Sequence, residues 1–343
     1  MRELIEELFR DQEAWVVGGA VRDESLDRPL LDVDVALAHP KAAARGFARR
    51  SGGAPFPLSE RHGAWRVALE DGRTVDFTPL RGTIEDDLST RDFSINAIAE
   101  RVGSDDYVDP YNGFGDLAAS RIRAVKDSVF EDDPLRLLRA VRLVDELDFR
   151  MVPETEELVR RGAELVTQPA GERILAELRR LSAGGYRRLD SLGLLEPLGG
   201  RIDDRLDRWD SPEYRLVAVF GEGVRRLPVS NELRRLAGAL LRAGRPDGDA
   251  RSIHRFRRAT EPWSLEALAF VGAPELAGAI EEARSQDPAE PLLRGDELDL
   301  PAGPEIGRLL AEIEEERAAG TIATKEEALE YARRNAGSVR EDG

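Results

Sequence analysis

The feature that most constrains the fold of this 343-residue chain is a change in its hydrophobic pattern near residue 133. Before that point, short β-branched runs alternate with Gly and Asp turns, a pattern that favours mixed α/β structure. After it, apolar residues recur at spacings of three and four, as in amphipathic helices. The chain is therefore predicted to begin with an α+β part and to continue as an all-α half.

The pattern also predicts individual elements. Strands are expected at residues 14–17, 32–36, 65–69 and 74–77, with a hairpin turn at 70–73 between the last two. Helices are expected at residues 135–147, 153–164, 172–183, 304–318 and 324–334. Thr324 and Glu327 have the spacing of a capping box, which supports a helix start there.

Composition excludes several classes of protein. The chain has no Cys and three His residues, so disulfides, thiolate metal sites and His-rich metal sites are excluded and a cytosolic location is expected. No apolar run approaches the roughly 18 residues that a membrane helix needs. The acidic N-terminal residues lack the basic start and apolar stretch of a secretory signal.

The net charge of −17 argues at first against nucleic acid, because phosphates repel an acidic surface. The charge is unevenly distributed, with −8 over residues 1–140, +3 over 141–258 and −12 over 259–343. The middle stretch is therefore the part of the chain where an RNA backbone is most readily accommodated.

Two glycines follow the first expected strand. Gly18 and Gly19, with Arg22 a few residues on, would let backbone N–H groups and a guanidinium approach an anionic group. A tight turn with no ligand explains the glycines equally well.

A carboxylate pair lies on the second expected strand. Asp32 and Asp34 are two residues apart and so share one face, while Val33 and Val35 point to the other. Two like charges so close repel unless a cation lies between them, and oxygen ligands of this kind suit Mg²⁺. Asp76 on a neighbouring strand would add the third carboxylate expected for two-metal phosphoryl transfer. A solvated strand face is the alternative.

Two further motifs carry charge beside apolar faces. Arg91 and Asp92 precede an apolar stretch that ends in Asn96, in a segment that an amphipathic helix would largely explain. Asp133 and Pro134 form a helix start, so Asp133 has a simple reading as an N-cap. Arginines at i+3 steps then form a ridge that requires anions, either phosphates or acidic side chains; they are Arg136, Arg139 and Arg142.

Together these motifs, in order and at suitable spacing, resemble the bacterial tRNA nucleotidyltransferase and poly(A) polymerase family, the class II polymerase β-like enzymes. The resembling segments are residues 18–34, 87–97, 109–117, 132–142, 172–178, 293–298 and 303–307. The resemblance implies a nucleotidyltransferase head with a small mixed β-sheet, followed by a helical neck, body and tail. The implied ranges are 1–132, 133–190, 191–272 and 273–343.

The resemblance also implies residue roles. Asp32, Asp34 and Asp76 would be catalytic, the first two holding Mg²⁺. The residues implied in nucleotide binding are Gly18, Gly19, Arg22, Arg91, Asp133, Arg136, Arg139 and Arg142. Asp133 and Arg136 would read the base, since a carboxylate accepts from the exocyclic amine of cytosine and adenine and is repelled by the carbonyl of uracil and guanine.

The implied function is addition or repair of the 3′-terminal CCA of tRNA from CTP and ATP. The chain has Thr90 and Asp132 where the family usually has Arg and Glu, so addition of A only, addition of CC only, or a poly(A) polymerase activity stay open. Residues 60–65, with His62 as a loop residue, would belong to the loop associated with the switch from C to A. An inactive RNA-binding homologue and a small-molecule adenylyltransferase are more distant alternatives.

The acceptor arm of tRNA is expected to leave the site beside the net-positive stretch. Phosphate contacts are predicted on Arg173, Arg179, Arg180, Arg187 and Arg188. Binding to these arginines would weaken steeply with salt, because each neutralised phosphate releases counterions.

Overall fold

The computed structural model describes residues 1–59, 63–204 and 206–336. They form two compact units, Met1–Asp207 and Arg208–Gly343. The predicted loop residue His62 lies outside the described residues. The predicted head and neck both fall within the first unit, and the four-part division of the chain stays a prediction. Among the described residues, no helix has both the length and the apolar character needed to cross a membrane.

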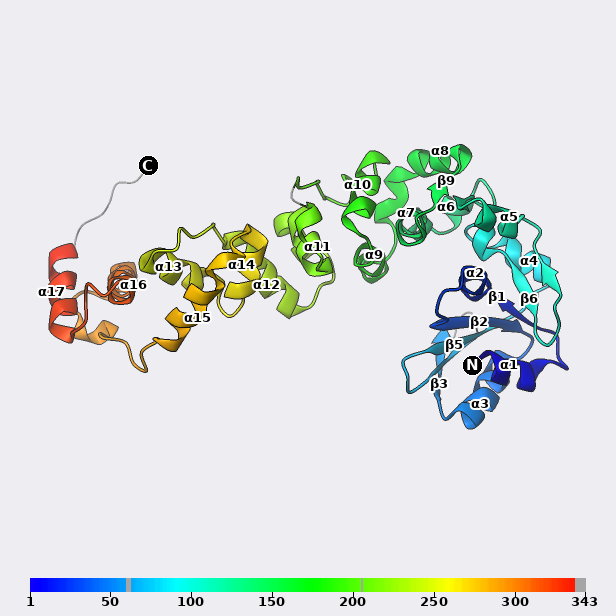
Figure 1. The fold of residues 1–343 in the computed structure, drawn as a ribbon, viewed down its shortest axis with the longest axis horizontal. Helices are drawn as coiled ribbons and strands as arrows, with labels where there is room; N and C mark the ends of the chain where they lie inside the picture. Colours follow the sequence, from blue (N-terminus) through cyan, green and yellow to red (C-terminus); the bar gives the residue numbers. More distant parts are fainter. Residues whose placement is uncertain (60–62, 205, 337–343) are drawn as a thin grey trace. The chain divides into compact units, whose positions relative to one another are not determined.

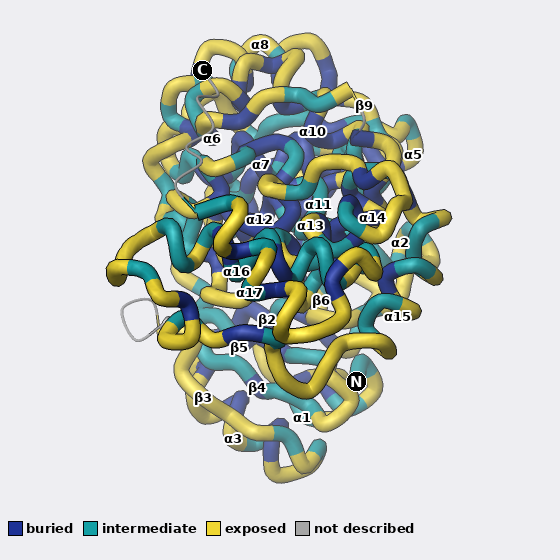
Figure 2. The backbone as a smooth tube through the Cα atoms, turned by 90° about the vertical axis from the view of Figure 1, so that its left-hand side faces the viewer, coloured by how far each residue is buried: buried dark blue, intermediate teal, exposed yellow. Residues whose placement is uncertain are grey.

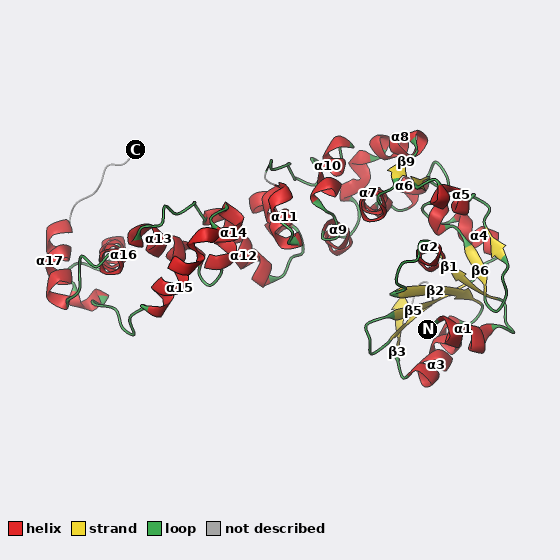
Figure 3. Ribbon diagram, in the orientation of Figure 1, coloured by secondary structure: helices red, strands yellow, loops and turns green. Residues whose placement is uncertain are grey.

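The first unit is built on a seven-stranded mixed sheet of strand order β3-β4-β5-β2-β1-β6-β7 (Figures 1 and 3). Among the described strands of this sheet, β2 and β5 are the one parallel pair, and the other neighbouring pairs are antiparallel. The strands are β1 (Ala14–Val17), β2 (Asp32–Leu37), β3 (Ala54–Ser59), β4 (Ala64–Ala68), β5 (Thr74–Pro79), β6 (Ala99–Arg101) and β7 (Tyr107–Val108). The mixed sheet expected from the resemblance is confirmed.

Helices cover this sheet on both faces. Its helices are α1 (Arg2–Phe9), α2 (Gly19–Ser25), α3 (Pro40–Ser51), α4 (Ile84–Ser89) and α5 (Gly113–Ala118). Helices α1 and α3 lie on one face, and α2 lies on the other (Figure 1). Phe9 and Phe47 pack against Phe77 of β5, with ring centroids 5.6 and 5.8 Å apart, which closes the α1 and α3 side. Val33 and Val35 are fully buried, as the alternation along β2 predicts.

A helical segment completes the first unit. It contains α6 (Val129–Asp132), α7 (Leu135–Leu147), α8 (Pro153–Arg161), α9 (Gly171–Leu178), α10 (Ala183–Ser191) and a short pair of parallel strands, β8 (Arg121–Ile122) and β9 (Arg150–Met151). Helix α7 has the bounds that its apolar spacing predicts and is largely buried (Figure 2). The single helix expected at 172–183 is wrong, because α9 ends at Leu178 and Ser182 caps a new helix by accepting from the Gly185 amide.

The second unit is helical throughout its described residues. Its helices are α11 (Pro212–Phe220), α12 (Asn231–Arg242), α13 (Ala250–Thr260), α14 (Ser264–Val271), α15 (Ala277–Ser285), α16 (Pro304–Ala318) and α17 (Lys325–Asn335). The capping box at Thr324 and Glu327 is confirmed at the start of α17. Among the described residues after 133, the prediction of an all-α second half therefore holds, apart from the two-residue strand β9.

Candidate active site

Strand β2 brings two carboxylates to the face of the sheet that α1 and α3 leave uncovered. Asp34 is the direct cross-strand partner of Asp76 on β5, and Asp32 is the partner of Thr74. The Thr74 hydroxyl donates to Asp32 at 2.5 Å, which fixes that carboxylate. The three carboxylates predicted from the sequence therefore share one face, as strand geometry requires.

Among the three carboxylates, Asp34 has a strongly raised pKa. Burial raises its pKa to about 6, Arg91 opposes that shift, and the nearby charges of Asp76 and Asp32 add to it. A partly buried carboxylate beside two others is held in an unfavourable ionised state at neutral pH unless a cation joins it. The charge at this point of the sheet is thus incompletely compensated by the protein itself.

The donor set fits Mg²⁺ as a two-carboxylate site. Within residues 1–59, 63–204 and 206–336, no three His, Cys, Asp or Glu side chains are gathered as a metal-binding group. Mg²⁺ does not need such a group, since it is commonly bound by one or two carboxylates together with substrate phosphates and water. Asp32 and Asp34 supply hard oxygen ligands of that kind, and the uncompensated charge on Asp34 favours a cation there.

Asp76 has a partner that the sequence analysis did not identify. Arg66 of β4 is its direct cross-strand neighbour and binds both carboxylate oxygens, with Nε and Nη2 at 2.6 and 2.7 Å. The hairpin predicted at residues 70–73 is present, but it closes one residue earlier, between Leu69 and Arg73. That register places Arg66 opposite Asp76, whereas a turn of four residues would have placed Val67 there.

The glycine turn after β1 approaches the carboxylates closely. Gly18 has φ +74°, and a Cβ atom there would lie 3.3 Å from Arg91 Nη1 and 3.4 Å from Asp34 Oδ2. A side chain is thus strained and crowded at this position. Arg22, one turn into α2, forks onto Asp23 at 2.9 Å and donates to Asn96 at 2.7 Å.

Asp92 and Asn96 connect α2 to α7. The Asp92 carboxylate is buried and accepts from the Phe93 amide, the Asn96 side chain and Arg139, at 2.8, 2.9 and 3.2 Å. Burial raises the pKa of Asp92, but Arg139 and these hydrogen bonds outweigh it and hold the pKa below its usual value. Asn96 then bridges Asp92 to Arg22, so these polar groups form one continuous chain.

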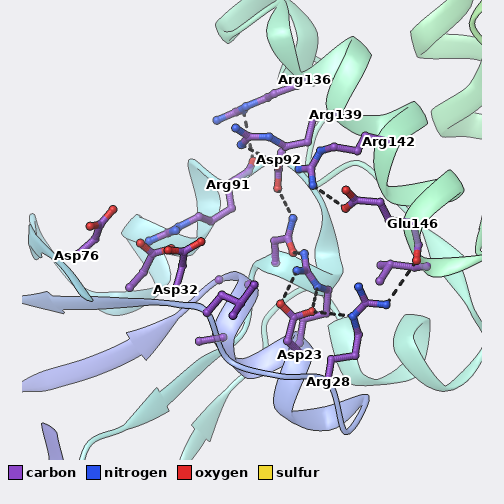
Figure 4. Close-up of a pocket in the computed structure, with 18 of the residues that line it drawn as sticks. Asp23, Arg28, Asp32, Asp76, Arg91, Asp92, Arg136, Arg139, Arg142 and Glu146 are labelled. Carbon is purple, nitrogen blue, oxygen red and sulfur yellow. Dashed lines mark hydrogen bonds and ion pairs between the residues drawn. The ribbon is translucent and has the colours of Figure 1, made fainter. Parts of the chain in front are cut away.

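The arginine ridge of α7 faces the same cavity, of roughly 720 Å³, as the carboxylates of β2 (Figure 4). The ridge is confirmed, and its anions are supplied by the protein. Arg136 donates to the Thr90 carbonyl at 2.6 Å. Arg142 binds Glu177 at 2.6 Å and Glu146 at 2.8 Å. Of the two kinds of anion left open by the sequence, acidic side chains are therefore the partners of Arg142 in the structure. Arg136 donates to a backbone carbonyl instead.

Asp133 lies apart from the cavity lining. It accepts from the Leu135 amide at 3.2 Å, which agrees with its reading as a helix cap, and from Arg173 at 2.8 Å. Among the described residues the lining includes Arg136, Arg139 and Arg142, together with Gly18, Gly19, Arg22 and Arg91, but not Asp133.

The arginines predicted to contact RNA are largely engaged in ion pairs on the first unit. Arg173 pairs with Asp133, Arg180 with Glu146, Arg187 with Asp207 and Arg188 with Glu156. An RNA phosphate would have to share or replace these partners.

Comparison with known proteins agrees with the fold and the motifs. Residues 14–123 match the poly(A) polymerase head domain family. The chain is 33% identical to the A-adding tRNA nucleotidyltransferase of Deinococcus radiodurans, over 94% of this chain and 95% of that enzyme. It is 30% identical to the CC-adding enzyme of Thermus thermophilus, over 94% of each. It is 46% identical to the CC-adding enzyme of Geobacter sulfurreducens, over 49% of this chain and only 40% of that enzyme.

Solved structures extend the likeness to the fold of the whole chain. The Thermotoga maritima CCA-adding enzyme complexed with tRNA superimposes with a TM-score of 0.65 at 21% identity, covering 97% of this chain and 94% of that one. At that identity the likeness shows the fold alone. The near full-length similarity to the Deinococcus and Thermus enzymes shows more: this chain belongs to the tRNA nucleotidyltransferase and poly(A) polymerase family.

Proposed function

We propose that this protein is a template-independent nucleotidyltransferase that completes or repairs the 3′-terminal CCA of tRNA from CTP and ATP. The observation that carries the proposal is the placement of Asp32 and Asp34 on one strand face, at the floor of a cavity rimmed by arginines, in a chain of this family. In the reaction the 3′-oxygen of RNA forms a bond to the α-phosphorus, the bond to the β-phosphate breaks, and pyrophosphate leaves. Because the substrates are tRNA, CTP and ATP, the location proposed for the protein is the cytoplasm.

Asp32 and Asp34 would hold Mg²⁺, which when bound activates the 3′-hydroxyl group and offsets charge on the transferring phosphate. Gly18 and Gly19 leave room for the triphosphate beside Asp34, and Arg22 supplies a guanidinium on the same side. Arg91 lies against Gly18 and Asp34, where it can contact the incoming nucleotide. These residues bind and orient the triphosphate.

Base selection is proposed for Arg136, which lines the cavity, and for Asp133, which precedes it at the start of α7 and lies outside the lining. A carboxylate accepts from the exocyclic amine shared by cytosine and adenine, and a guanidinium donates to the adjacent ring nitrogen. Both side chains already have partners, Arg173 for Asp133 and the Thr90 carbonyl for Arg136. Reading a base through them therefore requires that these contacts be exchanged when the nucleotide binds. Arg139 and Arg142 would hold α7 in place, Arg139 through its ion pair with Asp92 and Arg142 through its ion pair with Glu177.

The test is an incorporation assay with Mg²⁺ and tRNA that lacks its last one, two or three nucleotides. Each of the four nucleoside triphosphates is offered alone and in pairs. Ordered incorporation of CTP and then ATP supports the proposal, and no incorporation into any of the three tRNAs contradicts it. Asp32→Ala is the inactive control, and Asp71→Ala, in the exposed turn between β4 and β5, is the matched variant that should keep full activity.

A narrower activity, addition of A only or of CC only, is the second candidate. It is favoured by Thr90 and Asp132, where the family usually has Arg and Glu, and by the two near full-length relatives, one an A-adding and the other a CC-adding enzyme. In the same assay, an A-adding enzyme extends only tRNA that ends in CC. A CC-adding enzyme stops after two cytidines. Labelled nucleotide on a small acceptor in place of RNA would support an adenylyltransferase.

A further inference from the structure

The carboxylate face of the sheet continues beyond Asp76 to its outer edge. Asp34 pairs with Asp76, Asp76 with Arg66, and Arg66 with Phe56 of β3. Direct cross-strand partners place their side chains on the same face of a sheet. Asp34, Asp76, Arg66 and Phe56 therefore stand in one row that runs from the proposed metal ligands to the edge strand.

Arg66 is held rigidly and still faces the cavity. Its fork onto Asp76 uses Nε and Nη2 and leaves Nη1 outside that fork. Its side chain is 33% exposed, whereas that of Asp76 is 11% exposed, so the arginine covers the carboxylate and presents its own surface to solvent. A guanidinium fixed in this way loses little further freedom when it binds a phosphate.

Phe56 is unusually exposed for an aromatic residue in a sheet. Its relative exposure is 41%, and it lies on an edge strand. Pro55 and Pro57 flank it and lack amide N–H groups, so this edge is poorly suited to pairing with a strand of another protein. An exposed ring beside a fixed guanidinium is instead a typical arrangement for one nucleotide, with the base on the ring and the phosphate on the cation.

Reaction geometry indicates which substrate takes this position. In phosphoryl transfer the attacking and leaving oxygens lie roughly in line on opposite sides of the phosphorus. Gly18, Gly19 and Arg22 follow β1, on one side of Asp34 in the strand order, while Arg66 and Phe56 lie on the other side. A triphosphate bound at the glycines leaves the attacking hydroxyl to arrive from the side of β5, β4 and β3.

We infer that Arg66 and Phe56 bind the 3′-terminal nucleotide of the RNA acceptor, Arg66 through its phosphate and Phe56 through its base. Asp76 acts in this arrangement as the residue that positions Arg66. Neighbouring strands are about 4.8 Å apart, so the two side chains are close enough to contact a single nucleotide. This assignment rests on the proposed function, since it presupposes that RNA is the acceptor.

The first test is binding of labelled tRNA ending in CC, without Mg²⁺ or nucleotide, over a series of KCl concentrations. Arg66→Met should weaken binding on the order of tenfold, the loss of one charge-assisted hydrogen bond. It should also reduce the slope of log K against log [KCl] by about 0.7, the value for one single-strand phosphate. Phe56→Ala should weaken binding on the order of tenfold with no change of slope, because stacking carries no charge.

Matched variants distinguish the loss of an RNA contact from a loss of folded protein. Arg73 donates through the same two nitrogens, Nε and Nη2, to one carboxylate oxygen of Asp71 at the turn of the same hairpin, so Arg73→Met should change neither affinity nor slope. Arg66→Lys keeps the charge and should restore the slope. The double variant Arg66→Met with Asp76→Asn leaves no unpaired carboxylate, and it should show the same reduced slope if the single variant folds poorly.

Steady-state kinetics then decide whether Arg66 binds a phosphate of the RNA acceptor or a phosphate of the incoming nucleotide. Arg66→Met should raise KM for tRNA about tenfold and leave KM for ATP and CTP unchanged. An unchanged salt slope, or a rise in KM for the nucleotide alone, overturns the assignment. Failure of the wild-type protein to extend any RNA would contradict the proposed function instead, and the binding series would still report on Arg66 and Phe56.

Discussion

Two aspartates in the first unit, the partly buried Asp34 and the buried Asp92, have opposite electrostatic environments. Burial raises the pKa of Asp34 to about 6, and its carboxylate neighbours strengthen that shift. Burial also raises the pKa of Asp92, but Arg139, Asn96 and the Phe93 amide overcompensate and lower it. The protein therefore neutralises the charge of Asp92 with its own side chains and leaves the charge of Asp34 on β2 for a ligand to offset.

The largest effect of changing either aspartate is expected in catalysis, at Asp34. Asp34→Ala should reduce incorporation by a factor on the order of 10³ or more, because metal-assisted charge stabilisation contributes several kcal/mol to the transition state. Binding of tRNA should change less than twofold, since Asp34 carries no phosphate contact. Single-turnover incorporation and a binding titration on the same preparation measure the two quantities. Retained activity would show that Asp34 is not a metal ligand.

In the metal-free protein, ionisation of Asp34 should lower the free energy of unfolding as pH rises. Because the folded-state pKa is raised from 3.8 to about 6, the folded state holds this proton more tightly than the unfolded state. Stability from this group is present below about pH 4 and is lost as pH rises through 6, by up to about 3 kcal/mol. Asp34→Asn should lack that loss.

Chemical unfolding of both proteins between pH 4 and 8, with EDTA, measures the difference. Added Mg²⁺ should stabilise the wild type at pH 8 but not Asp34→Asn, since a ligand that binds the folded state raises its stability. Equal pH profiles for the two proteins would contradict an uncompensated charge at Asp34.

Asp92 should behave in the opposite sense. Asp92→Asn should destabilise the protein by about 2 kcal/mol near pH 7, because it removes a buried charge-assisted partner of Arg139. The folded-state pKa of Asp92 is lowered, so its contribution is present above the unfolded value near 4 and is lost as pH falls further. The stability gap between wild type and variant should therefore shrink between pH 5 and pH 3. A gap that widens with acid would reverse the assignment.

The sequence predicted local features well and distant partners poorly. Strand β1, helix α7 and the alternation that places Asp32 and Asp34 opposite Val33 follow from nearest-neighbour patterns, and the structure has them as expected. Glu146 lies only four residues from Arg142, on the same helix. The other acids that neutralise the α7 ridge come from far along the chain: Asp92 is 47 residues from Arg139, and Glu177 is 35 residues from Arg142. No local pattern reports such pairings, which only tertiary packing creates.

The smallest effect is expected at the arginines predicted to contact RNA. Arg180 is more than half exposed and pairs with Glu146, so Arg180→Met should change the free energy of unfolding by no more than about 0.5 kcal/mol. If a tRNA phosphate takes the place of Glu146, the same variant should lower the salt slope of tRNA binding by about 0.9, the value for one duplex phosphate. Arg50→Met, which removes the exposed ion pair between Arg50 of α3 and Glu7 of α1, is the matched control. A wild-type salt slope for Arg180→Met would show that Arg180 does not contact a phosphate. Its charge would then be neutralised within the protein by Glu146, as that of Asp92 is by Arg139.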